Sequence, residues 1–130
     1  DRLNNKKTPS LKCGGDNDKF RVSNASAKLD YPISLITADE VALAGGVSGV
    51  TNMNYYLYNS RYFWTFSPSF FDSYASRAIV WLVVSSESLN PWYSVTSSNG
   101  VRPVINLKAD ATISKGDGSS LNPFIVKTEG

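Results

Sequence analysis

Short runs of aromatic and β-branched residues, separated by turns rich in Ser and Asn, make up most of the chain after Gly49. These side chains favour strands because they pack well on a pleated, half-buried surface. Asp117 lies between Gly116 and Gly118, a combination that is typical of tight turns. No apolar run approaches the roughly 20 residues that a membrane span needs. The pattern predicts strands at 55–58, 62–66, 79–84, 92–95, 101–107 and 124–126.

One helix is predicted, near residues 38–44. Thr37 and Glu40 have the spacing of a capping box, in which the side chain of each residue bonds the backbone amide of the other. The consecutive glycines at 45–46 then end the helix. A chain of 130 residues is long enough for one core, so we expect a single α+β domain over 1–130, with short strands in antiparallel sheets.

The composition excludes several kinds of chemistry. The chain has no His, which rules out Ser-His-Asp and Cys-His catalysis, His-ligated zinc and imidazole pH switching. Thirteen basic and eleven acidic residues give a net charge of +2, and they are scattered, so no basic face for nucleic acid is predicted. We therefore expect no cofactor, no metal, no nucleic-acid partner and no enzymatic activity.

Two features near the N-terminus leave alternatives open. Cys13 is the only cysteine, so it is either a buried or idle thiol or the partner of a cysteine in sequence missing upstream, as in an extracellular protein. The run Asp16-Asn17-Asp18 is either a turn or a cation site, although it lacks the Gly and Glu of an EF-hand loop. Because the chain begins without Met, we interpret it as a fragment or a mature product.

Residues 54–107 combine the three Trp and most of the Tyr with many Ser and Asn. Tyr and Trp give large contact area with few rotors to freeze, while Ser and Asn give adaptable hydrogen bonds. This composition is typical of a recognition surface. Trp92, Tyr93 and Tyr74 are expected to be exposed anchors, and Arg102 is expected to pair with a carboxylate or carbonyl inside the fold. The strand residues expected in the core are Trp64, Ile79, Trp81, Leu82, Val83, Val101, Val104 and Ile105.

Several segments, in this order, resemble the formylglycine-generating (sulfatase-modifying) enzyme branch of the C-type lectin fold. Residues 35–46 resemble its LPTEAEWE…GG helix, and residues 64–67 and 80–83 resemble its tryptophan-bearing core strands. Residues 100–104 (GVRPV) are similar to its closing GFRPV. The resemblance spans roughly residues 31–107 and implies a C-type-lectin-like fold. The enzymatic activity is not implied, because the copper-binding pair of cysteines has no match here.

Within that superfamily, the sequence resembles two non-catalytic groups more closely. One is the variable proteins diversified by retroelements, whose lectin-type domain ends in an aromatic, Asn- and Ser-rich region before a GVRPV-like strand. The other is a set of pilin-like surface proteins of Gram-positive bacteria, whose tails resemble residues 100–126 and whose domain follows a prepilin-type segment. The resemblance implies an extracellular or cell-surface location in bacteria, a protein or glycan ligand and, for the second group, assembly into a surface polymer.

The main hypothesis is a non-enzymatic recognition domain with a surface around residues 67–99, and the alternative is the structural globular head of a pilin-like or cell-surface protein. Calcium-dependent sugar binding is not expected, since 90–92 and 122–124 hold only the Asn-Pro part of lectin signatures. Diversified proteins favour Asn, Ser, Tyr and Asp at their variable sites, and each matching position here is either a ligand-binding residue or an ordinary loop residue. The ligand-binding candidates are Ser67, Ser69, Phe71, Asp72, Tyr74, Asn90, Trp92, Tyr93, Ser94, Ser97 and Asn99.

Overall fold

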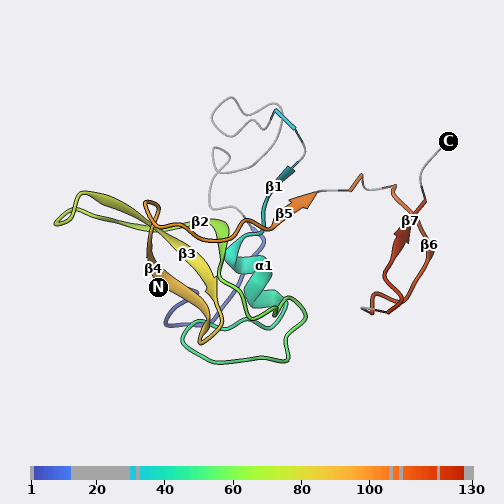
Figure 1. The fold of residues 1–130 in the computed structure, drawn as a ribbon, viewed down its shortest axis with the longest axis horizontal. Coiled ribbons are helices and arrows are strands. Elements are labelled where there is room, and N and C mark those ends of the chain that lie inside the picture. The colour runs from blue at the N-terminus through green and yellow to red at the C-terminus, as the bar shows by residue number, and fades with distance from the viewer. Residues whose placement is uncertain are drawn as a thin grey trace.

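The computed structural model describes residues 2–12, 30–31, 33–105, 107–108, 110–119 and 121–127. The described residues form one short helix and several antiparallel β-sheets, which agrees with the predicted α+β class (Figure 1). Among the described residues, no helix has the length and apolar character needed to cross a membrane. The elements are β1 (Ile33–Leu35), α1 (Ala38–Leu43), β2 (Phe63–Asp72), β3 (Arg77–Val84), β4 (Ser88–Ser94), β5 (Pro103–Ile105), β6 (Ile113–Lys115) and β7 (Ile125–Val126).

The largest sheet has three antiparallel strands in the order β2-β3-β4. Val83, on the central strand, pairs with Phe63 on one side and with Leu89 on the other, and all three side chains are buried. The ladder is interrupted by register shifts, two between β2 and β3 and one between β3 and β4. Such bulges increase local twist and bend a strand. The far ends of β2 and β3 accordingly extend away from the helix as a long hairpin (Figure 1).

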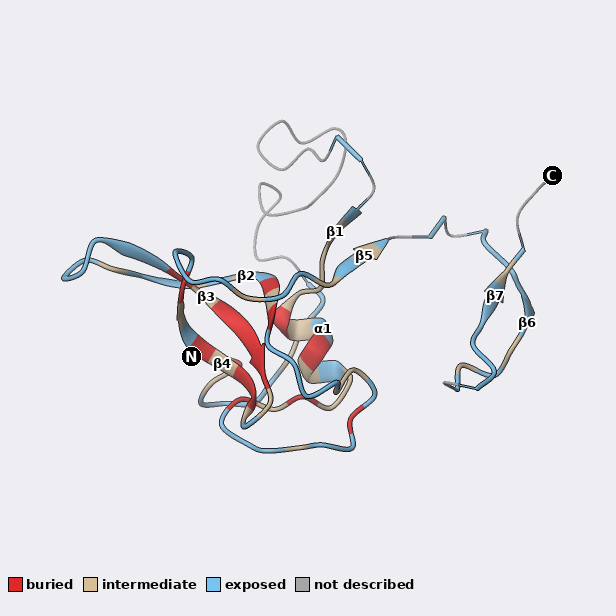
Figure 2. Cartoon of the chain, viewed as in Figure 1, coloured by how far each residue is buried: buried red, intermediate tan, exposed pale blue. Residues whose placement is uncertain are grey.

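Helix α1 covers one face of this sheet, and the core lies between them (Figure 2). The predicted capping box is confirmed: the Thr37 hydroxyl accepts from the Glu40 amide at 3.2 Å, and the Glu40 carboxylate accepts from the Thr37 amide at 2.8 Å. The helix is only six residues long, so most of its stability comes from tertiary packing. The buried residues of this core are Leu3, Ala38, Val41, Tyr55, Phe63, Trp81, Val83 and Leu89.

A two-stranded ribbon, formed by β1 and β5, adjoins the sheet. The segment before β5 runs beside the start of β2, where the Gly100 amide donates to the Tyr62 carbonyl at 3.1 Å. A Cβ at Gly100 would lie 2.7 Å from that carbonyl oxygen, so only glycine fits there without a shift. Arg102 behaves as expected: its guanidinium donates to the Leu57 carbonyl at 2.7 Å and lies 5.3 Å from the centre of the Phe63 ring.

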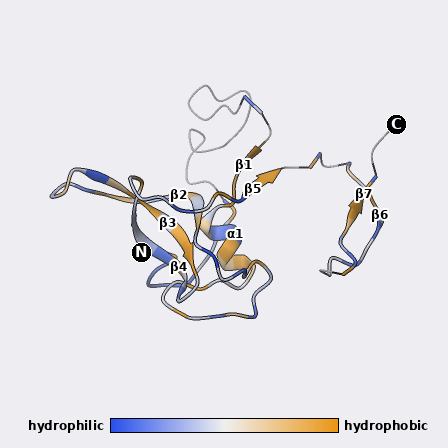
Figure 3. Ribbon diagram, in the orientation of Figure 1, coloured by the Kyte–Doolittle hydropathy of each residue, from blue (hydrophilic) through white to orange (hydrophobic). Residues whose placement is uncertain are grey.

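The last two strands form a separate hairpin, which we call the C-terminal hairpin (residues 113–126). Its turn is the predicted one, with Gly116 at a φ of 94°, a value that glycine adopts readily. The Asp117 amide donates to the Asn122 carbonyl at 3.0 Å and closes the turn. Figure 3 shows hydrophobic residues on β7 as well as on β3 and α1, although the C-terminal hairpin lies apart from the sheet and the helix.

Several local predictions are wrong. The expected strand at 55–58 is a turn, in which the Tyr58 amide donates to the Tyr55 carbonyl, and the Tyr55 ring enters the core beside the close-packed Gly45 and Gly46. Val101 and Ile105, expected in the core, are 68% and 65% exposed. Ile105 pairs with Ile33 of β1, outside the main sheet.

Other strands are predicted at the correct positions, but their predicted lengths differ from those in the structure. Residues 67–69, which follow the predicted strand 62–66, are the bulged middle of β2, and β4 begins four residues before the predicted 92–95. β3, β5 and β7 overlap the predictions at 79–84, 101–107 and 124–126. Ile79, Trp81, Leu82 and Val83 are buried as expected, and Trp64 and Val104 are partly buried. Cys13 and the run 16–18 lie outside the described residues.

Candidate functional site

The hairpin at the far ends of β2 and β3 carries much of the predicted site, and we call residues 69–78 the arm. Phe71 pairs with Ala78 and Asp72 with Arg77, beyond the last pairing of β3 with β4 at Ile79. The arm is therefore a two-stranded ribbon that leaves the three-stranded sheet. Figure 2 shows that its outer part is exposed, in contrast to the buried base of the same strands.

Asp72 organises the turn at the tip of the arm. Its carboxylate accepts from the Ala75 amide at 3.2 Å and from the Arg77 Nε at 3.1 Å. The bond from Ala75, together with that from Arg77, holds the pKa of the Asp72 carboxyl below its ordinary value. Ser76 takes a φ of 48°, which completes the tight reversal. Asp72, predicted as a ligand-binding residue, thus has an evident structural role at the turn.

Exposed aromatic side chains line the arm and the neighbouring part of β4. Tyr74, at the tip, is fully exposed, and Phe71 and Trp92 are 65% and 64% exposed. The Trp92 ring packs edge-on against Phe70, with ring centroids 5.2 Å apart and an interplanar angle of 75°. This contact connects the arm to β4. We call Phe70, Phe71, Tyr74 and Trp92 the aromatic surface, which covers both faces of the arm, because Phe70 and Phe71 are consecutive strand residues and point to opposite faces.

The backbone around Trp92 is held by its neighbours on β4. The Asn90 side chain accepts from the Trp92 amide at 2.9 Å and donates to the Glu87 carboxylate at 2.7 Å. Tyr93, expected to be an exposed anchor, is instead half-buried, because its ring packs edge-on against Tyr62 with centroids 6.1 Å apart. Burial, together with the proximity of Tyr62, raises the pKa of the Tyr93 hydroxyl. Trp92 is thus presented to solvent, while Asn90 and Tyr93 fix its position.

Some of the predicted site residues belong to the frame of the fold. The Ser67 hydroxyl accepts from the Ala38 amide at 2.9 Å, at the first residue of α1. Ser94 is buried, and its hydroxyl lies 2.9 Å from that of Thr96. The Asn99 side-chain nitrogen is buried, and among the described residues it has no hydrogen-bond partner. These three side chains therefore have places in the frame of the fold, Ser67 through its bond to α1 and Ser94 and Asn99 through burial of their polar atoms.

The predicted candidates therefore divide by position. Phe71, Tyr74 and Trp92 belong to the aromatic surface, and Ser97 is exposed in the turn after β4. Ser69 is half-buried at the base of the arm. Sequence reasoning missed Phe70, which contacts Trp92 only because of the register shift between Pro68 and Phe70. Pro68, which stands at that shift, is a local sequence signal for it, because a proline within a strand is confined to edge strands and bulges.

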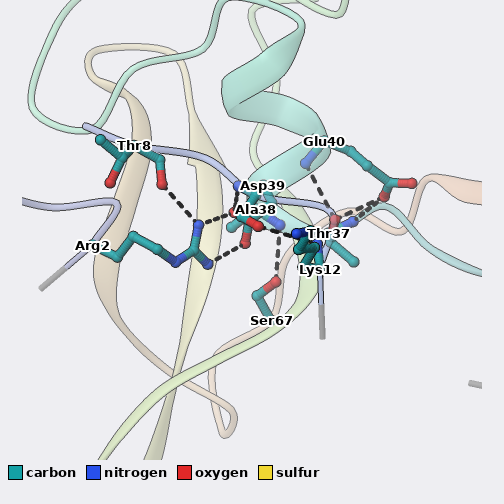
Figure 4. Close-up of polar contacts among 9 residues, drawn as sticks. Arg2, Thr8, Lys12, Thr37, Ala38, Asp39, Glu40 and Ser67 are labelled. Carbon is teal, nitrogen blue, oxygen red and sulfur yellow. Dashed lines mark hydrogen bonds and ion pairs between the residues drawn. The ribbon is translucent and has the colours of Figure 1, made fainter. Parts of the chain in front are cut away.

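A polar cluster joins the N-terminal segment to α1 (Figure 4). The Arg2 guanidinium forms a bidentate ion pair with the Asp39 carboxylate, which also accepts from the Ser10 amide at 2.6 Å. Burial raises the pKa of the Asp39 carboxyl, but the bonds from Arg2 and Ser10 outweigh it and leave that pKa below its ordinary value. Because each charge has a partner, this cluster is an anchor for the N-terminal segment. A cleft of about 330 Å³ lies beside it and includes Ser67 in its lining.

A larger, open cleft of about 610 Å³ separates Tyr56 and Arg102 from the turn of the C-terminal hairpin, which contributes Ser119 and Phe124. The Arg102 guanidinium is partly engaged by the Leu57 carbonyl and the Phe63 ring. Within the described residues, no group of three or more His, Cys, Asp or Glu side chains is placed to hold a metal ion. The arrangement offers aromatic and hydroxyl contacts to a partner.

Comparison of the chain with protein-family models, with curated proteins and with solved structures found no match.

Proposed function

We propose that this chain is a non-enzymatic recognition domain that binds a protein or glycan partner through the aromatic surface. The observation that carries the proposal is the exposure of Phe71, Tyr74 and Trp92 on and beside one projecting ribbon. Exposed Trp and Tyr side chains are the residues that most often dominate binding energy. Rigid aromatic rings also lose little conformational entropy on binding.

The support at the base of the arm favours the same function. Trp92 is fixed through Asn90 and Phe70, so its ring is preorganised before any partner arrives. Preorganised contact groups increase affinity because less ordering is needed on binding. We extend the proposal to a C-type-lectin-like fold that resembles the retroelement-diversified proteins, and to an extracellular or cell-surface location in bacteria.

The test is a binding screen of the intact chain on a printed glycan array and on an array of purified extracellular protein domains. For each partner found, the variants Trp92→Ala and Phe71→Ala are expected to weaken binding at least tenfold, with an unchanged near-ultraviolet circular dichroism spectrum. Tyr56→Ala is the matched control, because Tyr56 is an aromatic residue outside the arm and is at least as exposed as Trp92 and Phe71. Equal losses for Tyr56→Ala and Trp92→Ala would count against the aromatic surface.

A second test concerns the comparison with diversified proteins. Sister copies of the gene are expected to differ more at positions 67–99 than at positions 31–50, and the excess should fall on exposed positions such as Tyr74 and Trp92. Ser67, which bonds the start of α1, should vary less than Ser97. Equal variation in the two ranges would remove the diversified-receptor comparison and leave only the binding test.

A structural role is the second candidate function, as the globular head of a pilin-like or cell-surface protein. It is favoured by a different observation, the exposed C-terminal hairpin that lies apart from the sheet and the helix (Figure 1). The two functions are compatible, since the arm and the C-terminal hairpin leave the body in different directions (Figure 1).

A further inference from the structure

The C-terminal hairpin has little packing support in the form shown in Figure 1. Among the described elements, β6 and β7 pack on each other and share no substantial packing with any other strand or with α1. A two-stranded hairpin is marginally stable by itself in water and normally needs a third strand or a packed face. The hairpin follows β5 through the segment 106–112, so the rest of the chain stays close to it.

The larger cleft lies between the hairpin turn and the body of the fold. Tyr56 and Arg102 line it on the body side, and Ser119 and Phe124 line it on the hairpin side. The Tyr56 and Phe124 side chains are 77% and 54% exposed. Each wall of the cleft thus carries an aromatic ring that is open to solvent. Contact between the walls would stabilise the fold in proportion to the apolar area removed from water.

The hairpin turn holds the Phe124 ring in position. Gly118 has a φ of 84°, and a Cβ there would lie 2.6 Å from the Phe124 ring, so only glycine fits beneath it without a shift. The amides of Asp117 and Gly118 both donate to the Asn122 carbonyl, at 3.0 and 3.2 Å, and close the turn. Because ring and turn are already ordered together, little conformational entropy is lost when the ring packs on another surface.

The two walls also carry opposite charges. Arg102 is held by a backbone carbonyl and by the Phe63 ring, and no carboxylate among the described residues pairs with it. Asp117, in the hairpin turn, accepts from the Ser119 amide at 2.9 Å and has no cationic partner in the described part of the chain. The bonds from Ser119 hold the pKa of the Asp117 carboxyl below its ordinary value, so it is charged at neutral pH. Each wall therefore lacks the charge that the other supplies.

We propose that the C-terminal hairpin is a lid that closes over this cleft within the same chain. The structure described above is the open form, and closure carries Phe124 onto Tyr56 and Asp117 to Arg102. Exposed ion pairs contribute little by themselves, so the aromatic contact supplies most of the stabilisation and the charges direct the approach. The occupant is the chain's own hairpin because it already lines the cleft and its tether gives it a high effective concentration there. The inference goes beyond the function proposed above and does not use the aromatic surface.

The first test is amide hydrogen exchange in the hairpin, measured by NMR on the whole chain under reducing conditions because of Cys13. The Asp117 and Lys127 amides are bonded within this part of the chain and exchange mainly from the open form, so their rates report how much of the chain is closed. Tyr56→Ala should speed both about threefold or more, because it removes the aromatic contact without changing the hairpin. Met53→Ala is the matched control, since Met53 is 63% exposed in the same connection between α1 and β2 and does not line the cleft.

The second test observes the contact directly. Nuclear Overhauser effects between the ring protons of Tyr56 and Phe124 are expected in the wild-type chain. Asp117→Lys should weaken them by about twofold or more, because it places a second cation beside Arg102. Asp110→Lys makes the same change of charge at an exposed position outside the cleft lining and should leave them unchanged. Arg102 itself is kept, since its contacts with the body belong to the fold.

Several outcomes would overturn the inference. One is the absence of any Overhauser effect between Tyr56 and Phe124 in the wild-type chain, and another is equal exchange in Tyr56→Ala and Met53→Ala. A loss in Asp110→Lys as large as in Asp117→Lys would have the same meaning. An effect that weakens on dilution would place the contact between two chains, against a lid. Trp92→Ala should leave the exchange unchanged, so failure of the lid and failure of the recognition function are separate results.

Discussion

The two ends of the β2–β3 pair differ sharply in their surroundings. At the helix end, Phe63 pairs with Val83, and both are buried beneath α1. At the far end, Phe71 pairs with Ala78, and both are exposed. The backbone pairing is antiparallel in both places, so strand formation alone does not decide what a phenylalanine does. The cover provided by α1 and β4 at one end decides it.

This difference assigns two roles to the aromatic residues of one strand pair. Those at the helix end exclude water from the core, where large-to-small changes leave cavities. Those on the arm remain hydrated and contribute little to folding, so they are available for contact with a partner. The two groups of aromatic residues can therefore be told apart by how much their substitution changes the free energy of unfolding, which can be measured without knowing any ligand.

The largest expected effect compares two phenylalanines on β2. Phe63→Ala should lower the free energy of unfolding by about 3–5 kcal/mol, because a buried ring is replaced by a cavity. Phe71→Ala should change it by less than about 0.5 kcal/mol, as is usual for exposed positions. Urea unfolding followed by tryptophan fluorescence measures both. Similar losses for the two variants would mean that the arm packs against the body in solution.

The elements that depend on residue type and spacing alone could be predicted from the sequence. The run 79–84 and the capping box of Thr37 and Glu40 depend on residue type and spacing alone, and both are confirmed. The strand expected at 55–58 is wrong because Tyr55 gains more from core burial beside α1 than from strand pairing. The burial of Tyr55 depends on tertiary contacts, which the strand propensity of residues 55–58 does not include.

The candidate site shows the same limit. Exposure of Trp92 followed from its setting among Ser and Asn, but the contact with Phe70 depends on register shifts that bring distant residues together. Ile105 looks like a core residue by composition and is exposed, because its strand pairs with β1 and not with the main sheet. A period-2 pattern indicates a strand and not the sheet that the strand joins.

The next effect concerns the frame that holds α1. Asp39→Asn should lower the free energy of unfolding by about 1–2 kcal/mol at neutral pH, since hydrogen bonds to charged groups contribute about 1.5–3 kcal/mol and the partly exposed Arg2 is screened by solvent. The change removes the ion pair but keeps the shape of the side chain. The same urea unfolding experiment measures it, and an unchanged midpoint would show that the N-terminal segment is not anchored through Asp39.

The anchor at Asp39 also predicts a dependence on pH. The pKa of its carboxyl lies below the ordinary value of 3.8, so its contribution is complete above that value and is lost as pH falls through the lower folded pKa. The difference in unfolding free energy between wild type and Asp39→Asn should therefore shrink below about pH 4. Ser67→Ala is the control, because it changes no ionisable group. A difference that stays constant from pH 7 to pH 2 would contradict the assignment.

A smaller effect separates two serines that the sequence treats alike. Ser67→Ala should cost about 1 kcal/mol, because the first amide of α1 loses the acceptor that Ser67 provides. Ser69→Ala, at the base of the arm, should cost less than about 0.5 kcal/mol. Thermal unfolding of the two variants side by side measures the difference. A larger loss of stability for Ser69→Ala than for Ser67→Ala would contradict the assignment of Ser67 to the frame of the fold and of Ser69 to the arm.

The smallest effect concerns the contact that connects the arm to β4. A double-mutant cycle of Phe70→Ala and Trp92→Ala should give a coupling of about 0.5–1 kcal/mol, since edge-on aromatic pairs contribute about 0.5–1.5 kcal/mol and both rings are partly exposed. Trp92→Ala combined with Leu121→Ala is the control, and it should be additive because Leu121 lies in the separate C-terminal hairpin. A coupling near zero for Phe70 and Trp92, with both single variants folded, would mean that the arm moves independently of β4. The aromatic surface would then form only on binding, and its preorganisation could no longer support the recognition function.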